Sequence, residues 1–275
     1  MSTLTRTAAT ARRVLRQLAH DARSVAIVVV LPSILLWLFR EVFDGDARTF
    51  DRVGPQMLGI FPFVIMFLLT SVTMVRERTS GTLERLLTTP LRRGELIGGY
   101  ALAFGLAALA QALASSAVAV WLLGLDVETP WVVVLLAVVD AVLGTALGLL
   151  MSAFATTEFQ AVQFMPLVVI PQLLLCGLLA PRDQMAGVLH AISDVLPLSY
   201  AADAFTRTLT TSGLDGWLWR DLGVLVGCCV AAVALASLTL RRRSCRSRSE
   251  RVGTRSCGRW RTPRGWPRSS ASPST

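Results

Sequence analysis

Long apolar stretches alternate with short polar segments along the chain. A helix needs about 20 apolar residues to cross the hydrocarbon core of a bilayer, which is roughly 30 Å thick. The stretches that reach this length cover approximately residues 24–43, 56–75, 97–124, 131–154, 162–180 and 221–240. The pattern predicts an all-α, polytopic membrane protein whose six transmembrane helices lie within residues 24–240.

The polar segment before the first apolar stretch has a helical pattern of its own. Within residues 4–22, Val14, Leu15 and Leu18 share one helical face and arginines lie nearby. Residues 1–23 are therefore predicted to form a cytoplasmic segment with an amphipathic helix at the membrane interface. A frayed basic segment that only enforces topology is the alternative.

Between the fifth and sixth stretches lie two short helical patterns, around residues 184–195 and 198–210. Both are too short to cross a bilayer, so they are predicted to sit at the outer surface or to re-enter the membrane from outside. In either case they would cover the outer end of the helix bundle.

The polar connector at 76–96 reads RERTSGTLERLLTTPLRRGEL. Leu83, Leu86 and Leu87 recur at i, i+3 and i+4, which predicts a short amphipathic helix over 81–88. On periodicity alone this helix could lie on lipid with its arginines at the headgroups, or its leucine face could bind a protein partner.

Arginines decide the predicted orientation, because positively charged loops stay in the cytoplasm. They concentrate before the first stretch, in the connector at 76–96 and after the sixth stretch. The loop between the third and fourth stretches carries only the acids Asp126 and Glu128. Both termini and the connector are therefore predicted to be cytoplasmic.

The composition agrees with a membrane protein, since 53% of the residues are hydrophobic and only 16% are charged. The net charge of +9 arises from residues 241–275, which contain 11 arginines and one acid. The rest of the chain is nearly neutral, so the charge gives no support for nucleic-acid binding. The tail itself is rich in Arg, Ser and Pro and is predicted to be disordered, or to be read-through sequence without a function.

Catalytic motifs are absent from the sequence. The five cysteines include no C-x-x-C pair, and neither H-E-x-x-H nor G-x-S-x-G occurs. A P-loop needs a lysine to reach the nucleotide phosphates, and the chain has no lysine. We therefore expect no metal site, no cofactor bound by this chain and no catalysis within it.

Polar residues inside the apolar stretches are candidates for function. Asp140, Gln111 and Gln172 lie where an uncompensated polar group is costly. They could line a substrate path, with Asp140 attracting cations or taking part in proton movement. Alternatively, they could hydrogen-bond to neighbouring helices, and Asp140 could stay neutral. The pair Gly144 and Gly148 forms the small-x-x-x-small pattern of closely packed helices, which does not say which helix is the partner.

Two ordered motifs carry a resemblance to a known family. RERTSGTLERLLTTPLRRGELIGGY resembles the signature of membrane subunits of ATP-binding-cassette exporters of the second type (ABC-2), and LLLCGLLAPRDQMAGVLHAISDVLPLSYAADAFTRTL is similar to the outer segment of that family. Within it, the chain looks like permeases of the daunorubicin/doxorubicin-resistance type. The resemblance implies a coupling site for an ATPase formed by Glu77, Gly81, Thr82, Leu83, Glu84, Arg85, Leu86 and Leu87. It also implies an outer-gate segment that contains Pro181, Pro197, Tyr200 and Arg207.

The resemblance further implies a half-transporter in a bacterial cell membrane. Two copies of the chain would pair with two copies of a separate ATPase subunit, which would hold the ATP and Mg²⁺. The expected cargo is a hydrophobic or amphipathic compound, such as a drug or antibiotic, because the spans are dominated by Leu, Val and Ala. Export of a lipid-linked glycan or a lipid, and a membrane scaffold without transport, are the alternatives.

Overall fold

The computed structural model describes residues 3–43, 47–80, 93–125, 129–178, 182–210 and 216–255, and these residues form helices and turns without any strand. The helices before the long fourth apolar stretch are α1 (Thr3–His20), α2 (Ala22–Val42), α3 (Ala47–Thr79) and α5 (Arg93–Ala117), which ends in a π-helical turn at Val118–Leu122. After these come α6 (Pro130–Ser152), α7 (Glu158–Leu175), a 3₁₀ turn at Arg182–Gln184, α8 (Gly187–Ser193), α9 (Pro197–Thr210) and α10 (Gly216–Arg255). The predicted all-α fold is confirmed.

Six helices in the described residues are long and apolar enough to cross a membrane. The spans are Val25–Val42, Val53–Thr79, Gly94–Leu122, Pro130–Ser152, Glu158–Leu175 and Gly216–Thr239. All six match the predicted spans to within a few residues. Two of the helices extend well beyond their spans: α3 starts at Ala47, and α10 runs from Gly216 to Arg255. Charged residues in these extensions hide helical turns from a hydropathy window.

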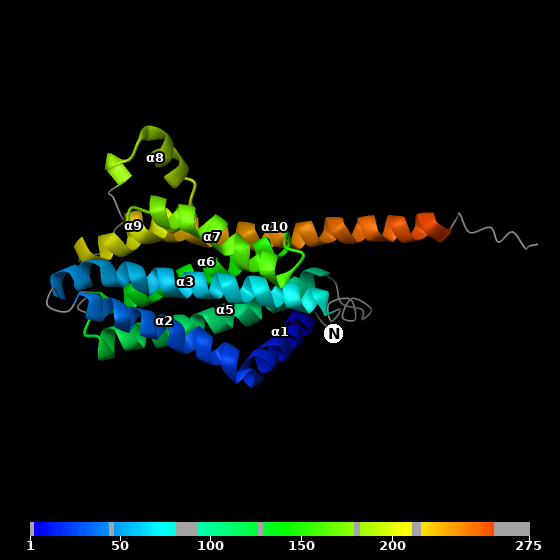
Figure 1. Ribbon diagram of the computed structural model, residues 1–275, viewed down its shortest axis with the longest axis horizontal. Helices are drawn as coiled ribbons and strands as arrows, with labels where there is room; N and C mark the ends of the chain where they lie inside the picture. The colour runs from blue at the N-terminus through cyan, green and yellow to red at the C-terminus, as the bar shows by residue number, and fades with distance from the viewer. Residues whose placement is uncertain are drawn as a thin grey trace, which may run out of the picture. The chain divides into compact units, whose positions relative to one another are not determined.

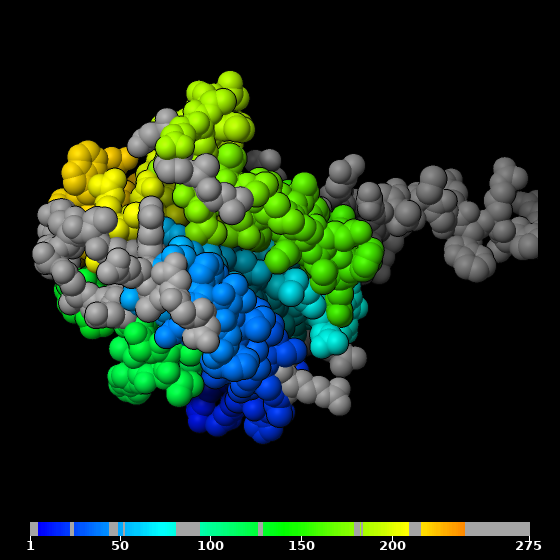
Figure 2. Space-filling view, turned by 60° about the vertical axis from the view of Figure 1, so that its left-hand side comes forward, coloured from blue at the N-terminus to red at the C-terminus, as the bar shows by residue number. Residues whose placement is uncertain are grey.

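The centre of the bundle is the pair of helices α3 and α6. In each of them 67% of the apolar stretch is buried, against 17% in α2, α7 and α10. Figure 1 shows α2, α3, α5 and α6 running alongside one another, and Figure 2 shows α2 and α7 on the surface of the bundle. Helices α2, α7 and α10 consequently expose many leucine and valine side chains on the surface of the bundle.

The contact between α3 and α6 includes a close approach of their backbones. A Cβ added at Gly144 would overlap the carbonyl oxygen of Phe63, and one added at Gly148 would lie 2.5 Å from the carbonyl oxygen of Phe67. The small-x-x-x-small pattern of α6 therefore serves to bring this helix against α3. Around this contact, Leu143 joins Phe63 and Phe67 in a core that extends to α7, α9 and α10.

The predicted N-terminal helix is present as α1, and it packs on protein. Ala11 and Val14 are buried, and α1 contacts α5 and α2. Its predicted place at the membrane interface stays a prediction. The same holds for the predicted re-entry of α8 and α9, although both helices exist close to the expected positions.

Residues Leu240–Thr275 form a unit of their own. The sequence predicted disorder for 241–275, whereas the structure has helix as far as Arg255. Arginine is a good helix former, and residues 241–252 contain neither glycine nor proline. They also continue an existing helix, so no new helix nucleus has to form.

Candidate functional site

A buried carboxylate lies at the end of α3, at the point where the chain enters the predicted coupling segment. Glu77 is 6% exposed. Its Oε2 accepts a hydrogen bond of 3.0 Å from the hydroxyl of Tyr100 on α5, and its Oε1 accepts one of 2.9 Å from Nε2 of Gln17 on α1. Glu77 therefore joins three helices, including the one before and the one after the coupling segment. We call Glu77, Gln17 and Tyr100 the Glu77 junction.

Helix α1 is held against α5 near this junction. The backbones approach closely where Gly99 faces Thr10, because a Cβ at Gly99 would lie 2.6 Å from the Cβ of Thr10. One turn earlier in α1, a guanidinium nitrogen of Arg6 lies 3.8 Å from Oε2 of Glu95, which is buried. The position of α1 is thus tied to the first turns of α5.

The end of α3 is also fixed to the turn between α6 and α7. Arg78 donates hydrogen bonds to the backbone carbonyl oxygens of Ser152 and Ala155. These two carbonyls lie at and just beyond the end of α6, where helical carbonyls lack partners within the helix. A movement of the end of α3 must therefore be felt by α1, α5 and α6.

The predicted coupling site can be placed only in part. Gly81, Thr82, Leu83, Glu84, Arg85, Leu86 and Leu87 lie outside the described residues. Glu77 lies within them, and the Glu77 junction was not predicted. Its tie to the coupling segment stays a prediction.

The candidate substrate-path residues are all buried. Asp140 is 1% exposed, and neither of its carboxylate oxygens has a hydrogen-bond partner among the described residues. The amide of Gln111 is likewise buried without a partner in the part of the chain that is described. Gln172 donates to the carbonyl of Val168 in its own helix, at 3.1 Å. The alternative prediction of hydrogen bonds to neighbouring helices is therefore not seen for these three residues.

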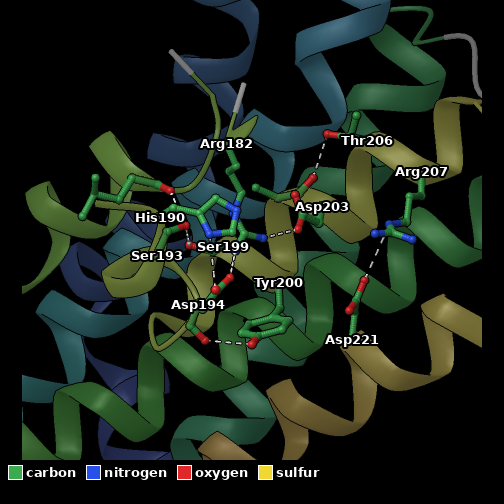
Figure 3. Close-up of polar contacts among 12 residues, drawn as sticks. Arg182, His190, Ser193, Asp194, Ser199, Tyr200, Asp203, Thr206, Arg207 and Asp221 are labelled. Carbon is green, nitrogen blue, oxygen red and sulfur yellow. Dashed lines mark hydrogen bonds and ion pairs between the residues drawn. The ribbon is translucent and has the colours of Figure 1, made fainter. Parts of the chain in front are cut away.

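A polar cluster lies at the other end of the bundle, where α8 and α9 meet the ends of α7 and α10 (Figure 3). The guanidinium group of Arg182 hydrogen-bonds to the carboxylates of both Asp194 and Asp203. Nδ1 of His190 lies 3.4 Å from Asp194. Because Arg182 is only 14% exposed, its pairing with two acids fixes the turn after α8 to the middle of α9. We call Arg182, His190, Asp194 and Asp203 the outer cluster.

The predicted outer-gate residues lie around this cluster. The hydroxyl of Tyr200 donates to the carbonyl of Asp194 at 2.7 Å. Nε of Arg207 lies 3.9 Å from Asp221 of α10, and its guanidinium stacks over Trp217 at 5.4 Å. Pro197 starts α9, and Pro181 lies outside the described residues. Tyr200 and Arg207 therefore fasten α9 at both of its ends.

A polar cavity of about 700 Å³ opens beside the outer cluster. Besides the cluster it is lined by Gln56, Thr206, Arg207 and Arg220 and by the turn that follows α7. Gly177 makes that turn with φ of +93°, a conformation that other residues rarely adopt. No group of His, Cys, Asp or Glu that could hold a metal ion occurs among the described residues.

Residues 5–210 match the sequence profile of a family described as "ABC-2 type transporter". The chain belongs to the ABC-2 type transporter family. As an ABC-2 protein it is the membrane-spanning part of a transporter, and its six spans make it a multi-pass membrane protein. The family assignment that the two motifs predicted is thereby confirmed.

Several characterised or named ABC-2 proteins are similar to the chain. It is 25% identical to the probable multidrug ABC transporter permease YbhS of Escherichia coli (strain K12) over 206 residues, which is 74% of this chain and 55% of YbhS. It is 26% identical to the linearmycin resistance permease protein LnrN of Bacillus subtilis (strain 168) over 182 residues, 64% of this chain and 46% of LnrN. The match to ABC transporter G family member 20 of Dictyostelium discoideum covers 58% of this chain and 22% of the relative, at 27% identity. The chain thus spans about half or less of each relative's length.

The sequence did not predict the hydrogen-bond and ion-pair partners that form the polar sites of this ABC-2 chain. Tyr100 and Gln17 were not singled out, because each is one polar residue in a helix whose neighbours look ordinary. Arg182 belongs to one of the two motifs, but its ion pairs were not predicted. A usable signal for Tyr100 is that the chain has only two tyrosines, and that this one lies inside an apolar stretch close to the start of that stretch. A tyrosine hydroxyl there needs a buried acceptor.

Proposed function

We propose that the chain is the permease half of an ATP-driven exporter that moves a hydrophobic or amphipathic compound out of a bacterial cell. A separate ATPase subunit binds ATP and Mg²⁺, and two copies of the chain form the path through the membrane. The family supports a transporter permease. The printed names of two relatives, a multidrug permease and a linearmycin resistance permease, favour a drug-like cargo.

The observation that carries this proposal is the Glu77 junction. An ATPase that docks on residues 81–87 pushes on the ends of α3 and α5, between which this segment lies. Close to the end of α3, Glu77 is buried and hydrogen-bonded to Gln17 of α1 and to Tyr100, which lies about two turns into α5. A displacement of the docked segment is thus passed to three helices at one point and moves them as a group.

The mechanism alternates between an inward-open and an outward-open bundle. Closure of the ATPase on ATP tilts α3 and α5, and the closely packed α6 follows α3 because backbone contacts at Gly144 and Gly148 leave no room for sliding. The outer cluster then separates to release cargo on the outside. Cargo enters from the cytoplasmic side or from the inner leaflet.

The test is transport into inverted membrane vesicles that contain the chain and a co-expressed ABC-type ATPase subunit. ATP should drive accumulation of a fluorescent amphipathic dye, and vesicles with an ATPase that cannot hydrolyse ATP should accumulate none. Equal dye movement with and without ATP would contradict the proposal. Accumulation that requires ATP but not this chain would contradict it as well.

A further inference from the structure

A phenylalanine of α9 fills a notch in the bundle directly beside a buried acid. The ring of Phe205, which is 1% exposed, occupies the space that a side chain at Gly59 of α3 would need. The same space is bounded by Asp140 of α6, whose Oδ2 lies 3.0 Å from the position of a Cβ at Gly59. The side chain of Phe205 thus packs from α9 against the place where α3 and α6 meet.

Asp140 lies in the buried part of α6. Both of its oxygens are buried without a hydrogen-bond partner among the described residues. Phe205 lies on one side of it, and the apolar core around Leu143 lies on the same helix. A carboxylate in such a place is costly unless it takes up a proton or a cation shares its burial. Binding of a cation is therefore one way in which Asp140 can meet this cost.

The same phenylalanine lies next to residues that line the outer cavity. Thr206, the next residue on α9, lines this cavity, and so does Gln56, about one turn before Gly59 on α3. Nε2 of Gln56 donates to the hydroxyl of Thr206 at 2.6 Å, so α3 and α9 are also joined beside Phe205. The polar cavity of about 700 Å³ thus ends within about one helical turn of the notch that Phe205 fills.

We propose that Asp140 binds the ammonium group of an amphipathic amine cargo, and that Phe205 separates this site from the outer cavity until the outward-open state forms. This inference rests on the proposed function in export. A metal ion fits the site less well, since one carboxylate is too few ligands and the described residues supply no cluster of further ones. An ammonium group attached to an apolar body matches both the lone acid and its apolar surroundings.

The proposal is tested by binding to the purified full-length chain, without ATP or an ATPase. Monodansylcadaverine is a fluorescent primary amine, and its N-acetyl derivative has the same apolar body without the charge. The wild type should bind the amine more tightly than the acetyl derivative. Asp140→Asn should weaken amine binding by about ten- to hundredfold, as expected when a charge-assisted hydrogen bond is lost, and leave binding of the acetyl derivative unchanged.

Two further variants separate amine binding by Asp140 from gating by Phe205. Glu158→Gln makes the same chemical change at the start of α7, where the carboxylate is partly exposed, and should bind the amine as the wild type does. Phe205→Ala should accelerate association of the amine several-fold in stopped-flow measurements, because the side chain that separates Asp140 from the outer cavity is removed. Unchanged amine affinity in Asp140→Asn, or loss of both probes together, overturns the binding site. Unchanged association in Phe205→Ala overturns the gate.

These outcomes are distinct from failure of the proposed function. Absence of ATP-driven dye accumulation together with amine binding that depends on Asp140 would reject export and keep the site. ATP-driven accumulation of a dye together with amine binding that ignores Asp140 would keep export and reject the site.

Discussion

Glu77 shows how a single acid can be buried at the end of an apolar helix. Each of its oxygens receives one hydrogen bond, from Gln17 and from Tyr100, and Tyr100 is itself completely buried. A buried polar group that loses its partner costs about 1–3 kcal/mol, whereas a bond made near water contributes less. The three side chains therefore depend on one another.

Tyr100→Phe tests this dependence, because it removes only the hydroxyl group. The ring still fills its place, but Oε2 of Glu77 loses its donor, so the free energy of unfolding should fall by about 1–3 kcal/mol. The fall can be measured by denaturant titration of the purified protein in detergent, with tryptophan fluorescence as the signal.

Tyr200→Phe is the matched control, because it removes the chain's other tyrosine hydroxyl. That hydroxyl donates to the carbonyl of Asp194 on the exposed side of the outer cluster, where water can replace it. Its loss should cost less than about 1 kcal/mol. Equal losses for the two variants would show that burial of Glu77 does not depend on its hydrogen bond from Tyr100.

At the level of helices, the sequence predicted the features that follow from periodicity along one helix. It did not predict which helices pack against each other. Hydropathy over 20-residue lengths predicted all six spans, and the glycines of α6 predicted close packing. The partner helix, α3, could not be predicted because periodicity describes one helix at a time. For the same reason Asp140 was singled out, whereas Phe205 and Gly59, which come from other helices, were not.

Gly144→Ala should weaken the packing of α6 on α3. The added methyl group meets the backbone carbonyl of Phe63, which cannot rotate away as a side chain could. The helices must separate, and overpacking of this kind costs about 1–3 kcal/mol of unfolding free energy. Gly105→Ala is the control, since nothing lies within 4 Å of a Cβ there, and it should leave the unfolding free energy unchanged or raise it by up to about 1 kcal/mol, because alanine favours a helix over glycine. Similar losses in the two variants would mean that the glycine contact does not hold the helices together.

Ion pairs of Arg182 hold the turn after α8 to α9, so this one charge should control the local stability of α8. Arg182→Gln leaves Asp194 and Asp203 without their shared partner and frees the turn after α8. Amide hydrogens of α8 should then exchange roughly tenfold faster, while those of α3 keep their rates. Hydrogen–deuterium exchange read by mass spectrometry measures both. Arg220→Gln, which removes a guanidinium stacked on Trp217, should leave α8 unchanged; a similar acceleration there would show that Arg182 is not the specific tie.

For the molecule as a whole, the proposed function requires a path from the ATPase to the outer cavity. On the proposed function, that path starts at residues 81–87, passes the Glu77 junction and the α3–α6 contact, and ends where Phe205 of α9 meets both helices. The start of the path was predicted from family resemblance alone. Its later steps required the structure, since each joins residues far apart in the sequence.

Glu84→Lys and Leu87→Asp should break this path at its first step. A reversed charge or an acid on the leucine face should abolish most of the affinity for the ATPase, because a few buried anchors carry most of the binding energy of an interface. Membrane levels and amine binding should match the wild type, since both residues lie in the polar connector and outside the predicted spans. ATP-driven dye accumulation in inverted vesicles should fall at least about tenfold. Leu189→Asp makes the same substitution on exposed α8 and should retain transport, so wild-type export by Leu87→Asp, or an equal loss in Leu189→Asp, would reject the coupling site.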